Sequence, residues 1–179
     1  MTYFIADCHF GHKNIIASCN RPFDGLEAMD ETLIANWQAR VTEKDDVYIV
    51  GDLMFFCPDP ERYLCRLPGR KHLIIGNHDP VWMKKTSPAF WFESIEHMEV
   101  IELAGRSVTL CHYPMMCWAE SGRDGLLVYG HIHGNRYDSF WPLLSKMENA
   151  LNAGVEVNGY RPVTLEELME NNRPFRRGE

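Results

Sequence analysis

Five short runs of metal-capable side chains stand out, and each follows a stretch of apolar residues. The runs are Asp7-Cys8-His9, Gly51-Asp52, Gly76-Asn77-His78-Asp79, His112 and Gly130-His131-Ile132-His133. Carboxylate oxygen, amide oxygen and imidazole nitrogen suit Mn, Fe or Zn. Their number exceeds the three or four ligands of one tetrahedral zinc ion. The sequence therefore indicates a site for two divalent cations, with seven candidate ligands: Asp7, His9, Asp52, Asn77, His112, His131 and His133.

The number of candidate ligands also suggests a chemistry. Two cations about 3.5–4 Å apart, bridged by one carboxylate, can hold a hydroxide between them. That hydroxide can attack the phosphorus of a phosphate ester while the cations stabilise the charge on its oxygens. We therefore predict a hydrolase of phosphate esters. A hydrolase with a single zinc ion and a different scissile bond is the alternative, because it needs fewer of these ligands.

Each run is a weak signal by itself, because a single histidine at a strand end is commonly a hydrogen-bonded structural residue. The run at residues 76–79 is more specific, since four polar or permissive residues after an apolar run would be an unusual way to make a turn. His131 and His133 are informative as a pair, because residues two apart in a strand face the same side. Together the runs indicate one shared site.

His78 is the candidate for proton transfer. It lies between the proposed ligand Asn77 and the carboxylate of Asp79. A protonated imidazole near pH 7 can donate a proton to a poor leaving group, and a neighbouring anion raises the pKa of a histidine. We predict His78 as the general acid and Asp79 as the catalytic carboxylate that orients it. The alternative is that His78 only caps the turn.

Two further side chains are candidates for substrate contact. His12 must lie near His9, so it could contact the phosphate or support a ligand. Arg21 could hold a phosphate with two parallel hydrogen bonds, although an arginine on a turn is usually solvated. The segment from Tyr113 to Trp118 follows His112, and it could line a pocket for an organic group or pack as a supporting loop.

Strand ends must bring these residues together. Apolar runs predict strands at residues 2–6, 46–50, 71–75, 126–129 and 151–157, and a hairpin of residues 98–103 and 107–111. Helices are predicted at residues 24–40, capped by Asp24, at 60–66, and from the capping box at Thr164 to about Asn171. Residues 80–95 are read as irregular with some helix, and the tail from Arg173 is expected to fray. The alternation predicts an α/β fold.

Length and composition set outer limits. The 179 residues suit one domain, residues 1–179, and the 45% hydrophobic and 24% charged content is ordinary for a globular protein. A net charge of −7 makes extended nucleic acid an unexpected partner. No apolar segment suggests a membrane span, and the first residues lack a secretory pattern, so we expect a cytoplasmic protein. The six cysteines form no C-x-x-C pair and are expected to be reduced.

In order and content, these motifs resemble those of the calcineurin-like metallophosphoesterases, particularly small single-domain bacterial and phage-type members. The pattern of that superfamily is D-x-H, G-D, G-N-H-[DE], a later single H, and G-H-x-H. Residues 9–16, 20–23 and 158–163 are also similar to the small members. The resemblance implies two mixed β-sheets packed as a sandwich and flanked by helices. It also implies one metal at Asp7, His9 and His133, a second at Asn77, His112 and His131, a bridge at Asp52, and His78 as general acid.

The resemblance implies a phosphoesterase with two divalent metals, of which Mn is favoured and Fe, Zn or Ni are possible. The substrate would be a small phosphate ester: a phosphodiester, such as a nucleotide or cyclic nucleotide, is preferred over a phosphomonoester. A protein-binding scaffold of the same fold is the alternative. Such a scaffold would lack His78 or several ligands, and all of them are present here. The oligomeric state is not predicted.

Overall fold

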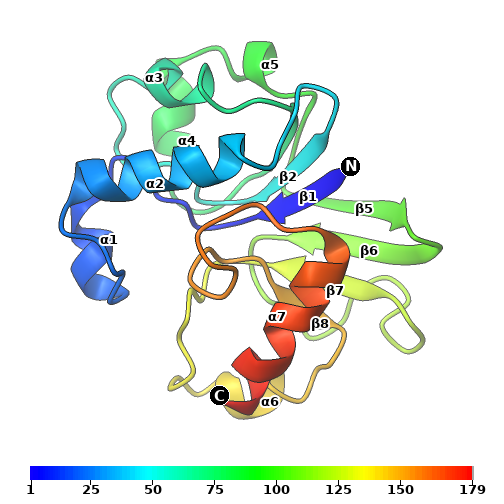
Figure 1. Ribbon diagram of the computed structural model, residues 1–179. Coiled ribbons are helices and arrows are strands. Elements are labelled where there is room, and N and C mark those ends of the chain that lie inside the picture. Colours follow the sequence, from blue (N-terminus) through cyan, green and yellow to red (C-terminus); the bar gives the residue numbers. More distant parts are fainter. Residues whose placement is uncertain (179) are drawn as a thin grey trace.

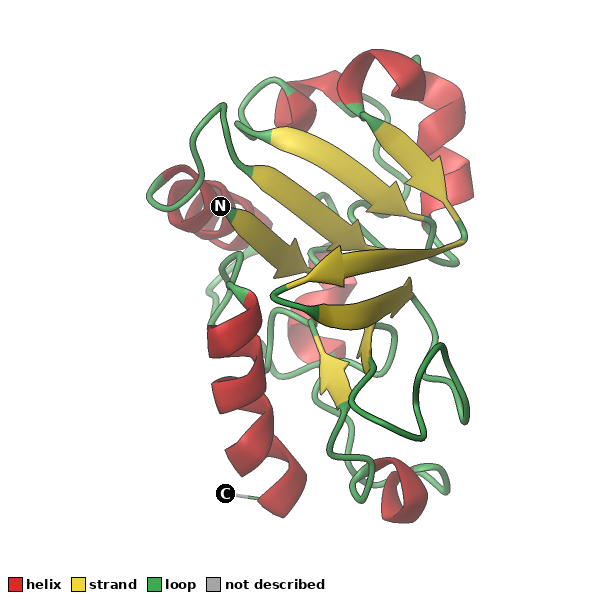
Figure 2. Cartoon of the chain, turned by 90° about the vertical axis from the view of Figure 1, so that its right-hand side faces the viewer, coloured by secondary structure: helices red, strands yellow, loops and turns green. Residues whose placement is uncertain are grey.

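Two four-stranded sheets form the centre of the computed structural model, which describes residues 1–178 (Figure 1). The first sheet contains, in spatial order, β1 (Thr2–Ile5), β2 (Asp46–Val50), β3 (Arg70–Ile74) and β4 (Ser94–Glu96). The second contains β5 (Met98–Leu103), β6 (Arg106–Cys111), β7 (Leu126–Tyr129) and β8 (Ala150–Asn152). Helices flank both sheets (Figure 2), and this architecture confirms the predicted fold class.

The strand directions bring the ends of several strands to one edge. Strands β1 to β4 run parallel, with an antiparallel bridge from Phe4 to Val163 beside them. In the second sheet, β5 and β6 form the predicted antiparallel hairpin, and β7 and β8 run parallel to β6. Loops that follow parallel strands converge at the carboxyl ends of those strands. Every candidate ligand lies in such a loop.

A buried apolar layer joins the two sheets. Phe4, Val50 and Ile74 of the first sheet belong to one cluster with side chains of the second sheet, including Leu110 and Val128. All five are fully buried. Alternate side chains of a strand face opposite sides, so the other faces remain for the helices. The sheets therefore pack as a sandwich that fixes the ends of β1, β2, β3, β6 and β7 relative to one another.

The longest helices cover the outer faces. Helix α2 (Leu26–Gln38) lies against the first sheet and buries Met29, Leu33 and Trp37, which recur on one face as predicted. Helix α7 (Leu165–Arg177) contacts β8 and β1. The short helices are α1 (Lys13–Ser18), α3 (Glu61–Leu64), α4 (Asp79–Trp82), η1 (Met83–Lys85), α5 (Pro88–Trp91) and α6 (Trp141–Leu144). Among the described residues, no helix combines the length and apolar character needed to cross a membrane.

Several local predictions require correction. Helix α2 begins after Gly25, not with Asp24 as its cap. Besides the short helices, residues 80–95 contain the start of the three-residue strand β4 (Ser94–Glu96), and such a strand is too short to leave an alternating pattern. The last strand ends at Asn152, and a loop follows it. The cysteines of the described chain are all free, as expected.

The carboxyl-terminal tail also differs from the prediction, because it does not fray. Helix α7 starts with the predicted capping box of Thr164 and Glu167 and continues through Pro174 to Arg177. Two contacts hold its second half. The fully buried Asn172 accepts a hydrogen bond from the backbone N–H of Asn152 at 2.7 Å, and Phe175 packs against Trp141 with ring centroids 5.0 Å apart.

Candidate metal centre

The seven candidate ligands meet at the carboxyl edge of the sheets. One ligand atom each from Asp7, His9 and His133 lies within 4.8 Å of the others, and the same holds for Asp7, Asp52 and His112. Asn77 Oδ1 lies 3.1 Å from His112 Nε2 and 3.0 Å from His131 Nδ1. The structure therefore brings together residues that are up to 126 positions apart in the chain, from Asp7 to His133.

Asp52 lies between two groups of ligands. Its Oδ2 atom is 3.6 Å from His9 Nε2 and 3.4 Å from His112 Nε2. His9 stacks on His133 with ring centroids 5.0 Å apart, whereas His112 and His131 lie on the side of Asn77. One carboxylate oxygen thus faces both groups, which is the arrangement that a bridging ligand requires.

The backbone at five ligands is strained. Asp7, His9, Asp52, His131 and His133 all have φ between 50° and 71°, a left-handed region that is uncommon for residues other than glycine. Backbone hydrogen bonds hold the first two: the N–H of Asp7 donates to Gly51 O, and that of His9 donates to Asp52 O, both at 3.0 Å. Strain of this kind costs about 1–3 kcal/mol per residue and concentrates at functional sites.

Two glycines permit the close approach of the loops. A Cβ atom on Gly51, whose φ is +86°, would collide with the imidazole of His112. A Cβ atom on Gly76 would collide with the carboxylate of Asp52. Only glycine fits at these positions, which explains why a glycine precedes the ligand in the Gly51-Asp52 and Gly76-Asn77 runs.

Burial and charge perturb the protonation of the ligands. Burial raises the pKa of Asp7 to about 7, against the influence of nearby His133 and His112. Burial lowers the pKa of His9 to about 2. Burial by itself would raise the pKa of Asp52, but hydrogen bonds and charges from His112 and other neighbours lower it to about 2. Bound cations would compete with protons for several of these groups.

His9 provides a direct test of whether cations suit this site. Both of its ring nitrogens are buried and have no hydrogen-bond partner within the described part of the chain. A buried polar atom without a partner is unfavourable by about 1–3 kcal/mol. A cation among His9, Asp7 and His133 would satisfy one of the two nitrogens. The donor set therefore fits divalent metals.

His78 lies at the rim of this cluster. Its Nε2 atom is 3.9 Å from Asp52 Oδ2, and its backbone N–H donates to Asp52 Oδ1 at 2.9 Å. Its side chain is about one-third exposed, at 36%, whereas the side chain of Asp52 is 2% exposed. This imidazole is accessible from solvent and close to the cluster, as proton transfer to a leaving group requires.

The carboxylate of Asp79, which was predicted to orient His78, is engaged by other donors. Its carboxylate is buried and accepts hydrogen bonds from the backbone of Asp52, Leu53 and Gly76 at 2.8–3.0 Å, and from Trp82 Nε1 at 2.7 Å. Burial raises the pKa of Asp79. Asp79 therefore holds the loop after β2 against the loop after β3.

The two predicted phosphate contacts have different surroundings. His12 stacks on Phe55 with ring centroids 3.8 Å apart and lies 5.4 Å from the His9 ring, so it is near the cluster. The guanidinium of Arg21 is buried and donates to the carbonyls of Asp7 and Cys8 at 2.7 and 2.9 Å. Arg21 therefore fixes the backbone of the first metal motif, and its side chain is fully buried.

Glu156 is a site residue that the sequence reading missed. Its Oε1 atom accepts from Arg21 Nε and Nη2 at 3.0 and 2.7 Å, and lies 2.9 Å from His133 Nδ1. Burial opposes protonation of His133, but hydrogen bonds with Cys19 and Glu156 raise its pKa to about 11. The one available signal was an acidic residue inside an apolar run, because a buried carboxylate needs a partner.

Comparison with known families agrees with this geometry. A sequence model of the calcineurin-like phosphoesterases matches residues 2–155. The chain belongs to this family. It is a metal-dependent phosphoesterase by membership, and the matched segment includes all seven candidate ligands and His78.

Individual relatives of this phosphoesterase resemble it along most of its length. It is 36% identical over 171 residues to the uncharacterised protein MJ1445 of Methanocaldococcus jannaschii, covering 94% of this chain and 89% of that protein. It is 30% identical over 160 residues to the gene 66 protein of Mycobacterium phage L5, covering 74% and 77%. The crystal structure of a protein of unknown function, AQ665 from Aquifex aeolicus, matches with a TM-score of 0.72, 30% identity and coverage of 95% and 98%.

Proposed function

We propose that this protein is a phosphodiesterase that works with two divalent cations. The observation that carries the proposal is the position of Asp52 Oδ2, at 3.6 Å from His9 Nε2 and 3.4 Å from His112 Nε2. Asp7, His9 and His133 would hold one cation, and Asn77, His112 and His131 the other. Asp52 would bridge them. Mn is the favoured metal, since all donors are oxygen or nitrogen, and Fe, Zn and Ni suit the same donors.

The bound cations, Asp52 and His78 would have separate roles in the reaction. Bound cations would supply Lewis acidity that activates water and stabilises charge on the phosphoryl oxygens. Asp52 would keep the cations at a fixed separation. His78 would donate a proton to the leaving oxygen, because its ring is at the rim, 3.9 Å from Asp52 Oδ2. General acid catalysis of this kind contributes about 10²–10⁴-fold.

The charges around the cluster favour a diester over a monoester. A phosphomonoester carries a second negative charge near neutral pH, and a guanidinium or ammonium group commonly neutralises it. Arg21, the guanidinium next to the first metal motif, is occupied by Glu156 and backbone carbonyls. A diester lacks that second negative charge, so it needs no such group besides the cations.

The free thiols of the described cysteines fit a cytoplasmic location.

The test compares two chromogenic substrates. Protein loaded with Mn should hydrolyse bis-p-nitrophenyl phosphate faster than p-nitrophenyl phosphate, and a chelator should abolish both activities. Metal analysis should give two equivalents of cation per chain. No turnover of either ester with any divalent metal would favour a protein-binding scaffold. One equivalent of zinc without phosphate-ester hydrolysis would support a single-zinc hydrolase.

A further inference from the structure

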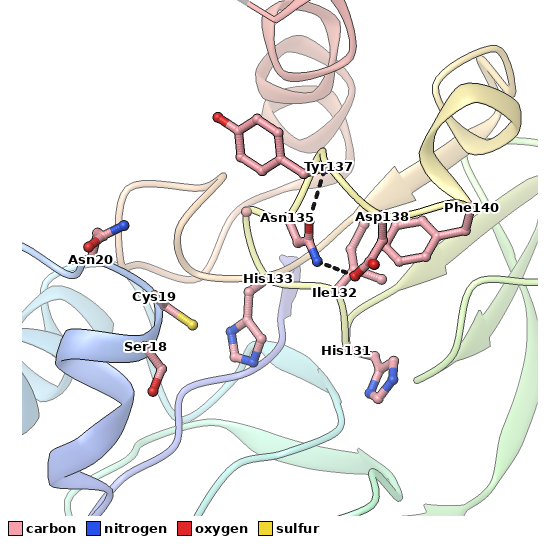
Figure 3. A pocket seen from close by; sticks show the side chains of 11 residues that line it. Ser18, Cys19, Asn20, His131, Ile132, His133, Asn135, Tyr137, Asp138 and Phe140 are labelled. Atoms are coloured by element: carbon pink, nitrogen blue, oxygen red, sulfur yellow. Dashed lines mark hydrogen bonds between the residues drawn. The ribbon is translucent and has the colours of Figure 1, made fainter.

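A cavity of about 530 Å³ opens beside the proposed metal centre. His131 and His133 form part of its wall, so it is continuous with the ligand cluster. Cys19 and Asn20, from the end of α1, face it from one side, and the loop between β7 and α6 faces it from the other (Figure 3). The volume lies in the range that small organic ligands occupy, about 300–1,000 Å³.

The charges of this cavity exclude a second phosphate group. Among the described residues that line it, Asp138 is the one formally charged side chain besides the two histidines, and no lysine or arginine is present. One oxygen of Asp138 accepts from Asn135 Nδ2 at 2.7 Å, which leaves capacity for another donor. Asn20 adds an amide. The cavity therefore suits an uncharged group that carries hydrogen-bond donors.

An aromatic side chain is available for stacking. Tyr137 is 92% exposed, and it is the most exposed of the large apolar and aromatic residues that the structure describes. It belongs to the cavity wall, and its backbone N–H donates to Asn135 Oδ1 at 2.9 Å, which ties it to the turn that carries Asp138. An exposed tyrosine gains nothing for folding, whereas a planar ligand would stack on its ring.

The proposed general acid lies outside the wall of this cavity. The His78 ring is 4.8 Å from Phe55 and 5.3 Å from His9, and none of these three residues lines the cavity. A leaving group that takes a proton from His78 would depart near Phe55. A phosphodiester carries a second organic group that stays on the phosphate. The cavity beside His131 and His133 is placed to receive that group.

We propose that this cavity binds the nucleoside that remains attached to the phosphate, so that the substrate class is a nucleoside phosphodiester whose base carries an exocyclic amino group. Tyr137 would stack on the base, and Asp138 would accept from its amino group. The proposal rests on the proposed phosphodiesterase function and specifies its substrate.

The experiment keeps the leaving group constant. The p-nitrophenyl esters of ethyl phosphate, adenosine 5′-monophosphate and inosine 5′-monophosphate release the same product, so differences in kcat/KM report the retained group. With Mn-loaded protein, the adenosine ester should exceed the ethyl ester at least tenfold. Tyr137→Ala should lower this ratio about tenfold, because one stacked base contributes a factor of that order. Phe90→Ala removes another exposed ring, on α5, and should leave the ratio unchanged.

Asp138→Asn tests the amino group. The wild-type protein should prefer the adenosine ester over the inosine ester, which has a carbonyl in place of the amine. The variant should lose or invert that preference, since an amide can donate to the carbonyl. Adenosine alone, titrated into the metal-free protein and followed by NMR, should shift amides near Asn20 and Tyr137.

The outcomes separate the two proposals. Equal kcat/KM for all three esters, with no effect of Tyr137→Ala, would overturn the nucleoside site and leave the phosphodiesterase function intact. Hydrolysis of none of the esters with any metal would overturn the function. The adenosine titration would then test nucleoside binding in the cavity independently of hydrolysis. If the amides near Asn20 and Tyr137 did not shift, the proposed nucleoside site would be overturned as well.

Discussion

Arg21 and Glu156 form a buried ion pair, 2.7 Å long, between the segment after α1 and the loop after β8. The same guanidinium holds the backbone of Asp7 and Cys8, and the same carboxylate contacts His133. The pair therefore connects the first metal motif with the last. Two stretches without a proposed ligand are thereby connected to the site: Arg21 belongs to residues 20–23, and Glu156 lies two positions before residues 158–163.

Glu156→Gln should weaken metal binding. Glutamine keeps the size of the side chain but removes the negative charge that holds His133 Nδ1. Loss of such an outer partner typically lowers metal affinity about 10–100-fold. Isothermal titration with Mn would measure the change. Glu170→Gln, on the exposed side of α7, is the matched control. Equal affinities in the two variants would show that Glu156 does not position His133.

Arg21→Ala should destabilise the fold. The substitution leaves the Glu156 carboxylate buried without its partner, and breaking a buried pair in this way costs about 3–5 kcal/mol. Urea denaturation monitored by circular dichroism gives the free energy of unfolding. Arg123→Ala removes an exposed ion pair with Glu120 and should change that free energy by less than about 1 kcal/mol. A similarly small change for Arg21→Ala would contradict the structural role assigned here.

Asp7→Asn should alter how stability depends on pH. Burial raises the pKa of Asp7 from 3.8 to about 7, so the folded metal-free protein keeps this proton where the unfolded chain has lost it. Asp7 thus contributes stability that is fully present below pH 4 and is lost as the pH rises through 7. In the presence of chelator, the free energy of unfolding of the variant should increase relative to that of the wild type from pH 4 to pH 8. The relative increase should be on the order of 4 kcal/mol. A stability difference independent of pH would refute this.

His78→Ala should separate metal binding from proton transfer. The metal content should stay at the wild-type value, because the ring is at the rim of the cluster and is not a proposed ligand. Hydrolysis of a diester with an alkyl leaving group should fall about 10²–10⁴-fold. The p-nitrophenyl ester should lose much less, since its leaving group needs no proton. Parallel losses for both esters would exclude the general-acid role.

Asp79→Asn should act on stability more than on the chemistry of His78. An amide nitrogen would face the N–H donors of Asp52 and Gly76, or of Leu53 and Trp82, and leave buried donors unpaired. Each such donor costs about 1–3 kcal/mol. Thermal denaturation should show the loss, while the pH of maximal kcat should stay in place. A shifted optimum with unchanged stability would restore the original prediction for Asp79.

The strands and proposed ligands were accessible from the sequence because both leave local signals. Each of β1, β2 and β7 is rich in apolar residues and stops at a polar cluster, and buried parallel strands have this appearance. Strand β3 begins with three basic residues, but it ends with the apolar Leu73 and Ile74 before such a cluster. His131 and His133 are paired in the sequence itself. The expectation that these ends meet needed only the rule that parallel strands share one edge.

The remaining features depend on distant partners. Glu156 acquires its role only through Arg21 and His133, which lie 135 and 23 positions away. Asp79 is next to His78 in sequence, but the turn directs its carboxylate to backbone N–H groups instead. Pro174 is a local signal for a helix end, and the packing of Asn172 and Phe175 overrides it.

The left-handed backbone at Asp7, His9, Asp52, His131 and His133 has a consequence for evolution and for engineering. Glycine at any of these positions would relieve local strain, so a change that abolishes the chemistry could make the polypeptide more robust to heat. Selection for thermal tolerance alone would then favour inactive descendants. A library screened for both properties should retain the strained residues and find its improvements elsewhere.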